Sequence, residues 1–280
     1  MSLNTENAVL PGTKKAKGGY QATPLSVNRQ MMRATLDIAR QQNNIQALIE
    51  VDISKPRELI RIHKEQTGER LSLTAYVVAC LGRAIAHHPQ LNSFRKRQKL
   101  ILLDDVTISV MVERELEGER MPENLGVRCA QERTIREIHE VIRTAQDHAD
   151  DGLGGLEGMT WIRFIPGFLM RSFVRLASRN ISMMKRYGAV GVTAIGMFSS
   201  KNQALWAIPL VGGATVAVAI GGIVERPCLI DGQLESREHL CLTVTFNHEI
   251  VDGAPAARFL KTFSEVLKSG DLLIDEVKHE

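Results

Sequence analysis

Apolar residues recur at helical spacing in several parts of this chain, and some of these parts end at a helix-breaking residue. Both signals predict helices. The segment at 71–87 is apolar on most sides and stops before Pro89, so we expect a buried helix capped by Ser72 or Thr74. The segment at 134–148 is amphipathic, with apolar residues on one face. The complete set of predicted helices among these segments is 26–42, 55–66, 71–87, 134–148 and 254–267.

Alternating or β-branched runs predict strands between these helices. They are expected at 45–54, in two short pieces within 99–113, and at 191–198, 203–210, 214–230 and 239–247. Residues 114–125 are highly charged and are interpreted as a loop. Helices and strands mix along the whole chain, which indicates one α/β domain with a mixed sheet. We expect a flexible arm at 1–22, the domain at 23–275 and a short tail at 276–280.

The composition is that of a globular protein, with 280 residues, 44% hydrophobic and 24% charged. A net charge of +3 is too weak to indicate nucleic acid binding. The four cysteines form no CxxC pair, so neither a disulfide nor a metal site is expected. The chain shows neither a signal peptide nor an apolar run of the ~20 residues that span a bilayer, which favours a cytoplasmic protein.

Charge is distributed unevenly, because residues 158–224 contain seven Lys and Arg residues and no Asp or Glu. Within them, residues 166–186 are predicted as one basic amphipathic helix, with Arg171, Arg175 and Arg179 on one face. Leu169, Phe173, Leu176 and Ala177 take the other face. One interpretation is a surface helix whose apolar face covers the core. The other is a surface for an anionic cofactor, an acyl chain or an anionic membrane.

The segment 245–260 carries the sharpest chemical signal in the chain. A β-branched strand ends at Asn247, His248 follows at its tip, and Asp252-Gly253 turns the chain into a helix. Histidine accepts and returns a proton near neutral pH, so His248 is a candidate general base. Two alternatives remain from spacing alone: half of a metal site, or a capped residue at a strand end.

The spacing from His248 through Asp252 to Gly253 is similar to the HxxxDG motif of 2-oxo acid dehydrogenase dihydrolipoyl acyltransferases, a family related to chloramphenicol acetyltransferases. Further segments resemble that catalytic domain in the same order, and the likeness covers most of residues 24–275. The resemblance implies a two-layer α/β sandwich with a mixed sheet. The segments are PLSVNRQMMRATL (24–36), EVDISK (50–55), HPQLNS (88–93), GVTAIGMF (191–198) and AIGGIVERP (219–227).

The resemblance implies acyl transfer with coenzyme A or acyl-CoA as substrate and without a metal. His248 would be the general base that frees a thiol, hydroxyl or amine for direct attack on a thioester. Thr193 would hydrogen-bond the oxyanion. Asp252, the third member of the catalytic set, would shape the site through an ion pair with Arg29, or else Arg33.

Three further residues are assigned supporting roles by the same likeness. Gly253 would serve the tight turn, Asn247 would support the site, and Gly221 would lie against coenzyme A. The family builds its site between subunits of a homotrimer, with the histidine from one and the hydroxyl residue from its neighbour, so a trimer is expected here.

Departures from the family pattern bear on substrate access. Asn247 and Glu249 flank His248 where the family has Asp and Arg, and residues 114–125 and 166–186 replace shorter family segments. A lipoyl domain is not expected in this chain, so the acceptor would be a small molecule or would arrive on a separate carrier protein. The alternative to an enzyme is a non-catalytic trimeric scaffold or acyl-CoA-binding protein.

Overall fold

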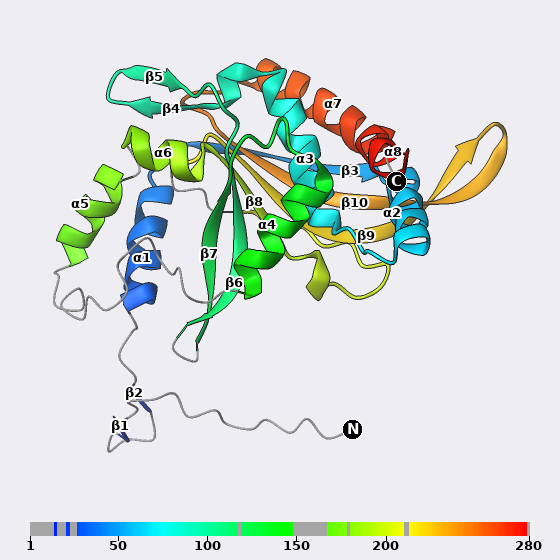
Figure 1. Ribbon diagram of the computed structural model, residues 1–280. Coiled ribbons are helices and arrows are strands. Elements are labelled where there is room, and N and C mark those ends of the chain that lie inside the picture. The colour runs from blue at the N-terminus through cyan, green and yellow to red at the C-terminus, as the bar shows by residue number, and fades with distance from the viewer. Residues whose placement is uncertain are drawn as a thin grey trace.

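The computed structural model describes residues 14–15, 21–22, 27–116, 119–147, 167–177, 180–209 and 213–278. A six-stranded sheet with strand order β3-β10-β9-β8-β6-β7 organises the domain (Figure 1). Strand β8 runs parallel to both β6 and β9, and the other neighbours are antiparallel. The sheet is therefore mixed, as predicted. Its strands are β3 (Asn44–Asp52), β6 (Ile108–Leu116), β7 (Glu119–Val127), β8 (Val190–Ala194), β9 (Val216–Ile230) and β10 (Gln233–Asn247).

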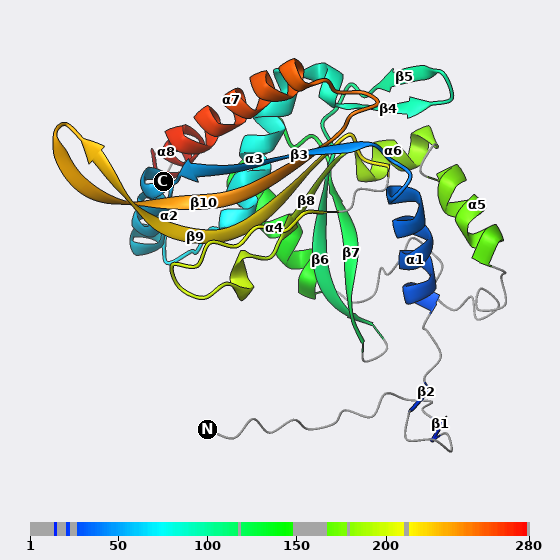
Figure 2. The ribbon, with the colours of Figure 1, turned by 180° about the vertical axis from the view of Figure 1, so that it is seen from behind.

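Helices cover one face of the sheet, and the other face comes forward when the molecule is seen from behind (Figure 2). The central helix α3 is buried along most of its length, and its N-cap Ser72 accepts a hydrogen bond from the Ala75 N–H at 3.1 Å. Alternate residues of the strands, such as Val192, Val218 and Val244, complete this core. The covering helices are α2 (Ser54–Thr67), α3 (Leu73–Ala86), α4 (Ile135–Asp147), α7 (Gly253–Ser269) and α8 (Asp271–Lys278).

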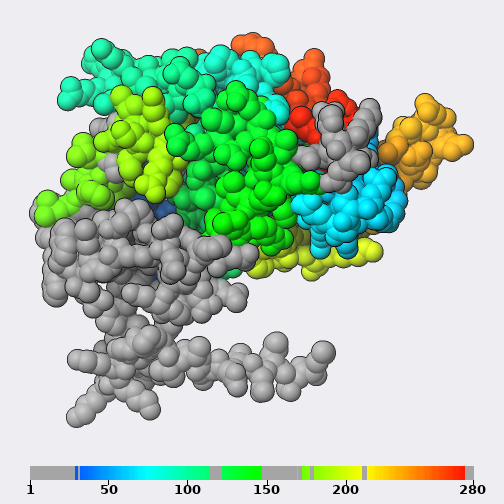
Figure 3. Space-filling view, in the orientation of Figure 1, coloured from blue at the N-terminus to red at the C-terminus, as the bar shows by residue number. Residues whose placement is uncertain are grey.

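Strands β9 and β10 are long and continue past the sheet as a hairpin that projects from the body (Figure 3). Smaller elements lie outside the six-stranded sheet and its covering helices. They are the paired strands β1 (Lys14–Lys15) and β2 (Gln21–Ala22), the hairpin of β4 (Ser93–Lys96) and β5 (Lys99–Leu102), and the 3₁₀ helices η1 (Pro89–Leu91) and η4 (Gly196–Phe198).

The prediction of a charged loop at 114–125 is wrong, because β6 and β7 form an antiparallel hairpin through this region. Ile108 lies opposite Val127 and Val110 opposite Leu125, so apolar pairs next to the core set the register. Backbone hydrogen bonding does not depend on side-chain polarity. The ladder therefore continues outward through residues whose composition alone indicates a loop.

The prediction of a strand at 203–210 is also wrong. In its described part, residues 203–209, this segment has no regular structure. The Leu205 carbonyl accepts a hydrogen bond from the Gly222 N–H at 2.9 Å. The apolar residues that suggested a strand thus belong to an irregular segment that is hydrogen-bonded to β9.

The single helix predicted at 166–186 is two helices, α5 (Gly167–Ala177) and α6 (Ile181–Tyr187). Asn180 is the N-cap of α6, where its side-chain oxygen accepts from the Ser182 N–H at 2.9 Å. A new helix therefore starts where the prediction continued the old one. Helices α1 (Val27–Ala39) and α5 lie side by side at one end of the sheet, with α6 close by (Figures 1 and 2).

Candidate active site

Asn247 fixes the turn that follows β10. It is buried, and its backbone N–H donates to the Thr215 carbonyl at 2.9 Å. Its own carbonyl accepts from the N–H groups of Ile250 and Val251, both at 3.0 Å, and its side-chain oxygen accepts from the Glu249 N–H, also at 3.0 Å. A neutral amide here satisfies the backbone of the turn. This geometry fits the supporting role predicted for Asn247.

His248 sits on this turn with its backbone held and its ring accessible. Its N–H donates to the Asn43 carbonyl at 2.7 Å, and its side chain is 45% exposed. The ring atom Nδ1 lies 2.9 Å from the Val251 carbonyl oxygen. A carbonyl only accepts hydrogen bonds, so in the neutral imidazole Nδ1 carries the proton and Nε2 has the lone pair. The turn therefore selects the tautomer that a general base needs.

Asp252 follows one turn later and is 87% exposed. Its Oδ1 lies 3.8 Å from Nδ1 of His248, which is too long for a hydrogen bond. Arg29 lies near the start of α1 and is exposed. This contact is an ion pair only when His248 is protonated, and the pair of Asp252 with Arg29 or Arg33 stays a prediction.

The two glycines of the predicted set have different surroundings. Gly253 is the first residue of α7, its φ is not positive, and an added Cβ would meet nothing within 4 Å. The turn therefore does not require glycine at 253. At Gly221 an added Cβ would lie 1.9 Å from the Leu205 carbonyl oxygen. The close approach at this position is made by the chain's own segment, while contact with coenzyme A stays a prediction.

Thr193 lies on β8, on the sheet face opposite the helix-covered core. Its hydroxyl is 3.8 Å from the sulfur of Met111. The strand register places Thr193 opposite Ala219 and Ala219 opposite Thr243, five residues before His248. The path from Thr193 to His248 crosses two strand spacings, from β8 to β10, and then runs five residues along β10. The two residues are therefore about 20 Å apart. One subunit therefore does not bring Thr193 and His248 to the same carbonyl group.

Glu249 makes an ion pair that the sequence did not reveal. Its carboxylate lies 3.0 Å from the Arg95 guanidinium on β4, so the β4–β5 hairpin is tied to the turn that carries His248. The two residues are far apart in sequence. The sequence feature that could have suggested this ion pair is the cluster of cations at residues 95–99.

The buried cysteines are poor nucleophiles. Burial raises the pKa of the Cys80 thiol to about 12, and burial also raises the pKa of Cys241. Both thiols therefore stay protonated near neutral pH. Within the described ranges, no cluster of three His, Cys, Asp or Glu side chains could hold a metal ion.

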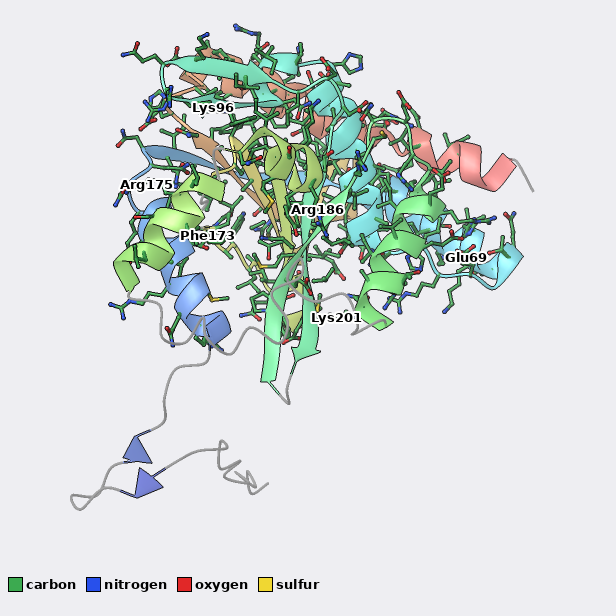
Figure 4. The ribbon with its side chains drawn as sticks, turned by 60° about the vertical axis from the view of Figure 1, so that its left-hand side comes forward. Glu69, Lys96, Phe173, Arg175, Arg186 and Lys201 are labelled. Atoms are coloured by element: carbon green, nitrogen blue, oxygen red, sulfur yellow. The ribbon has the colours of Figure 1, made fainter. Side chains whose placement is uncertain are left out.

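The basic residues predicted as one stripe fall in different places. Arg171 lies in α5, and Arg179 lies outside the described residues. Arg175 is exposed, and its guanidinium donates to the Gln41 side-chain oxygen at 2.7 Å. Figure 4 looks onto this side of the molecule, with Arg175 and Phe173 on α5 and Arg186 on α6. Of the helices that the structure describes, none is long and apolar enough to cross a membrane.

Comparison with protein families finds one match. The family described as 2-oxoacid dehydrogenases acyltransferase (catalytic domain) matches residues 17–161 and 183–274. The turn at His248 and strand β8 lie inside the matched parts. Residues 162–182, which contain α5, lie between them.

Curated proteins of similar sequence include two dihydrolipoyllysine-residue succinyltransferase components of 2-oxoglutarate dehydrogenase complexes. The mitochondrial protein of Saccharomyces cerevisiae is 25% identical, with 88% of this chain and 48% of that protein covered. The Staphylococcus saprophyticus protein is 24% identical, with 94% and 57% covered. The chain thus spans about half the length of the curated relatives it matches.

Solved structures share the fold. A probable dihydrolipoamide acetyltransferase from Listeria monocytogenes superposes with a TM-score of 0.68 at 19% identity, covering 90% of this chain and 95% of that one. The dihydrolipoamide acetyltransferase (E2p) of Azotobacter vinelandii gives 0.67 at 16% identity, covering 95% and 100%. The predicted α/β fold is thereby confirmed.

Proposed function

Since the chain belongs to the family of 2-oxoacid dehydrogenase acyltransferase catalytic domains, we propose that it transfers an acyl group between a coenzyme A thioester and a thiol, hydroxyl or amine acceptor. Thiols rank first, because the relatives' names specify dihydrolipoyllysine residues. The acceptor is then a small molecule or a group carried by a separate protein. Coenzyme A is a substrate of this reaction.

The observation that carries the proposal is the state of the His248 ring. With its proton held on Nδ1 by the Val251 carbonyl, Nε2 takes the proton from the acceptor. The freed heteroatom bonds to the thioester carbonyl carbon, and the carbonyl electron pair moves onto oxygen. When the intermediate collapses, the C–S bond breaks and the coenzyme A sulfur takes the proton back from Nε2. No covalent acyl-enzyme is needed, in keeping with the raised pKa of Cys80 and Cys241.

Thr193 of a neighbouring subunit donates to the oxyanion in this proposal. Within one subunit Thr193 is about 20 Å from His248 by strand register, so the hydroxyl must come from a second copy. A homotrimer with cyclic symmetry supplies three equal sites of this kind. Donors aimed at a developing oxyanion typically contribute 10²- to 10³-fold in kcat, and this is the contribution we assign to Thr193.

The test of transfer uses acetyl-CoA and succinyl-CoA with dihydrolipoamide as the first acceptor. Free coenzyme A is separated and quantified, because exchange between thiols leaves the total number of thiols unchanged. We expect release by the wild type and none above background by His248→Ala. Binding of acyl-CoA without release, across thiol, hydroxyl and amine acceptors, would favour the non-catalytic scaffold instead.

A site between subunits has a further consequence. His248→Ala and Thr193→Ala are each expected to be inactive or nearly so, yet mixed oligomers contain interfaces where both wild-type side chains meet. In randomly mixed cyclic oligomers about one interface in four is of this kind, so activity should return to roughly a quarter of wild type. A mixture that stays at the mean of the two variants, after subunit exchange has been verified by mass, contradicts the shared site.

A further inference from the structure

An exposed apolar pair, Leu100 and Leu102 of β5, lies beside the turn that carries His248. Leu100 is the cross-strand partner of Arg95, and the Arg95 guanidinium pairs with Glu249, the residue after His248. Cross-strand partners point to the same face of a hairpin. The exposed fractions of Leu100 and Leu102 are 44% and 54%. We call these two leucines the hairpin patch.

The opposite face of this hairpin is anchored to the body. The β4–β5 hairpin stands at one end of the molecule, beside α6 (Figures 1 and 2). Phe94 of β4 packs with Met184 of α6 in a small second core, and Ile101 of β5 packs against that core. Successive side chains of a strand point to opposite faces, so this packing turns the hairpin patch outward. The patch is therefore exposed on a hairpin whose position is fixed.

A second exposed apolar pair, Met197 and Phe198 of η4, lies near Thr193. These two side chains are 72% and 74% exposed. A Cβ added to the first residue of η4 would lie 2.0 Å from the Gly221 carbonyl oxygen, so η4 rests directly on β9. Gly221 follows Ala219, the β9 partner of Thr193, by two residues, so η4 lies about 7 Å along the sheet from Thr193. We call Met197 and Phe198 the η4 patch.

Each patch adjoins one half of the shared site. Large apolar side chains that are exposed next to one another mark interaction sites, whereas single ones are ordinary on protein surfaces. Thr193 and His248 are about 20 Å apart in one subunit, so they meet at one thioester only when two subunits bring their regions together. The approach that brings Thr193 to the neighbour's His248 also carries the η4 patch toward the neighbour's hairpin patch.

Building on the shared site of the proposed function, we propose that the η4 patch of one subunit packs against the hairpin patch of its neighbour. The occupant of each patch is thus a second copy of this chain. The contact is head-to-tail, because the two patches are different parts of the chain, and head-to-tail contacts that close on themselves form a ring. In a cyclic trimer one such contact lies beside each shared site, and removal of the four side chains from water favours the assembly.

Cross-linking between subunits tests this contact. Phe198→Cys and Leu102→Cys are made separately in the full-length chain, with the partly exposed Cys129 and Cys228 replaced by Ser. The two proteins are mixed, allowed to exchange subunits and treated with a short bismaleimide, which does not require the strict geometry of a disulfide. We expect about tenfold more covalent dimer in the mixture than in either protein alone, because a head-to-tail contact does not pair identical residues.

Lys64→Cys gives a matched control. Lys64 is exposed on α2, in the helix layer that covers the other face of the sheet from η4. Mixed with Phe198→Cys, it should yield no more covalent dimer than the single proteins do. A dimer that is absent with Leu102→Cys, or equally abundant with Lys64→Cys, overturns the contact. A specific cross-link in a protein that transfers no acyl group would uphold the contact and reject the proposed function instead.

Loss of the η4 patch should act on activity through assembly. Met197→Ser with Phe198→Ser should raise the concentration at which the oligomer dissociates by about tenfold, measured by light scattering over a dilution series. Acyl transfer per subunit should then fall on dilution and recover at high protein concentration, whereas Thr193→Ala should stay slow at every concentration. Circular dichroism checks that the variant is folded. A monomeric wild type, or unchanged dissociation in this variant, overturns the proposal.

Discussion

The turn at His248 and helix α5 are both accessible from solvent, but they are built in opposite ways. The turn is held by backbone N–H groups that donate to the carbonyls of Thr215 and Asn43, and the carbonyl of the buried Val251 sets the tautomer of the exposed His248 ring. In α5, by contrast, it is the large apolar side chains that are exposed. Proton transfer needs placement within a fraction of an ångström, and the backbone of the turn supplies it, whereas the exposed side chains of α5 have no such restraint.

Replacing His248 with Ala should have the largest effect on activity. Loss of the general base removes on the order of 10²- to 10⁴-fold in kcat, while the midpoint of thermal unfolding stays near that of the wild type because the ring is half exposed. Initial rates of coenzyme A release measure this. His87→Ala, at an exposed histidine after α3, is the matched control and should leave the rate unchanged.

Thr193→Ala should lower kcat by about 10²- to 10³-fold with little change in KM, since an oxyanion donor acts mainly in the transition state. Thr193→Ser keeps the hydroxyl and should recover most of the rate. Equal rates for the Ala and Ser variants would mean that the Thr193 hydroxyl has no role in catalysis. The proposed site between subunits would then have no oxyanion donor at this position.

Replacing Gly221 or Gly253 with Ala tests which of the two positions is too closely packed to accept a side chain. In Gly221→Ala the new Cβ would lie 1.9 Å from the Leu205 carbonyl oxygen and 2.9 Å from that of Cys241, so backbone must shift. We expect a loss of about 1–3 kcal/mol in the free energy of unfolding. Gly253→Ala meets open space at the start of α7 and should be neutral or stabilising by up to about 1 kcal/mol. Urea unfolding of both variants measures the contrast.

The sequence predicted the scaffold of the site well for physical reasons that are local. A β-branched strand ending at Asn247 and a helix beginning beyond Asp252 are readable from periodicity and turn residues, and the structure has both. The buried helix capped by Ser72 is confirmed for the same reason. Two other predictions were wrong. The charged composition of residues 114–125 hides the β6–β7 hairpin, and the apolar residues near Leu205 form an irregular segment bonded to Gly222 instead of a strand.

The site itself was predictable only in part. The position of His248 follows from its place at a strand end, but the Nδ1 bond to Val251 and the Arg95–Glu249 pair depend on three-dimensional geometry. In the proposed site Thr193 comes from a second subunit, so a single chain does not test it. For α5 the sequence left two interpretations open, because helical periodicity defines an apolar face without saying what it contacts.

Glu50 and Arg226 test how the strand that carries His248 is held. They lie on β3 and β9, on either side of β10, and are joined by two hydrogen bonds of 2.9 and 2.7 Å. Hydrogen bonding from Arg226 holds the pKa of the Glu50 carboxyl below its usual value. The pair therefore stabilises the fold above the ordinary carboxyl pKa, and this contribution is lost as pH falls through the lowered value.

Replacing Glu50 with Gln should thus lower stability slightly at pH 7 and not at all at strongly acidic pH. The effect is small because both side chains are partly exposed. Unfolding by urea at several pH values measures the difference between variant and wild type. A difference that grows as the pH falls would contradict the assignment.

The smallest expected change is in stability at α5, and it tests the comparison most directly. Phe259 is fully buried and stacks on Phe263 with ring centroids 5.8 Å apart, so Phe259→Ala should cost about 3–5 kcal/mol. Phe173 is 53% exposed, so Phe173→Ser should change the free energy of unfolding by no more than about 0.5 kcal/mol. A loss of several kcal/mol on replacing Phe173 would mean that its ring is buried in the folded protein in solution. The contrast between a fixed turn and a helix with an outward apolar face would then fail, because α5 would be part of the core.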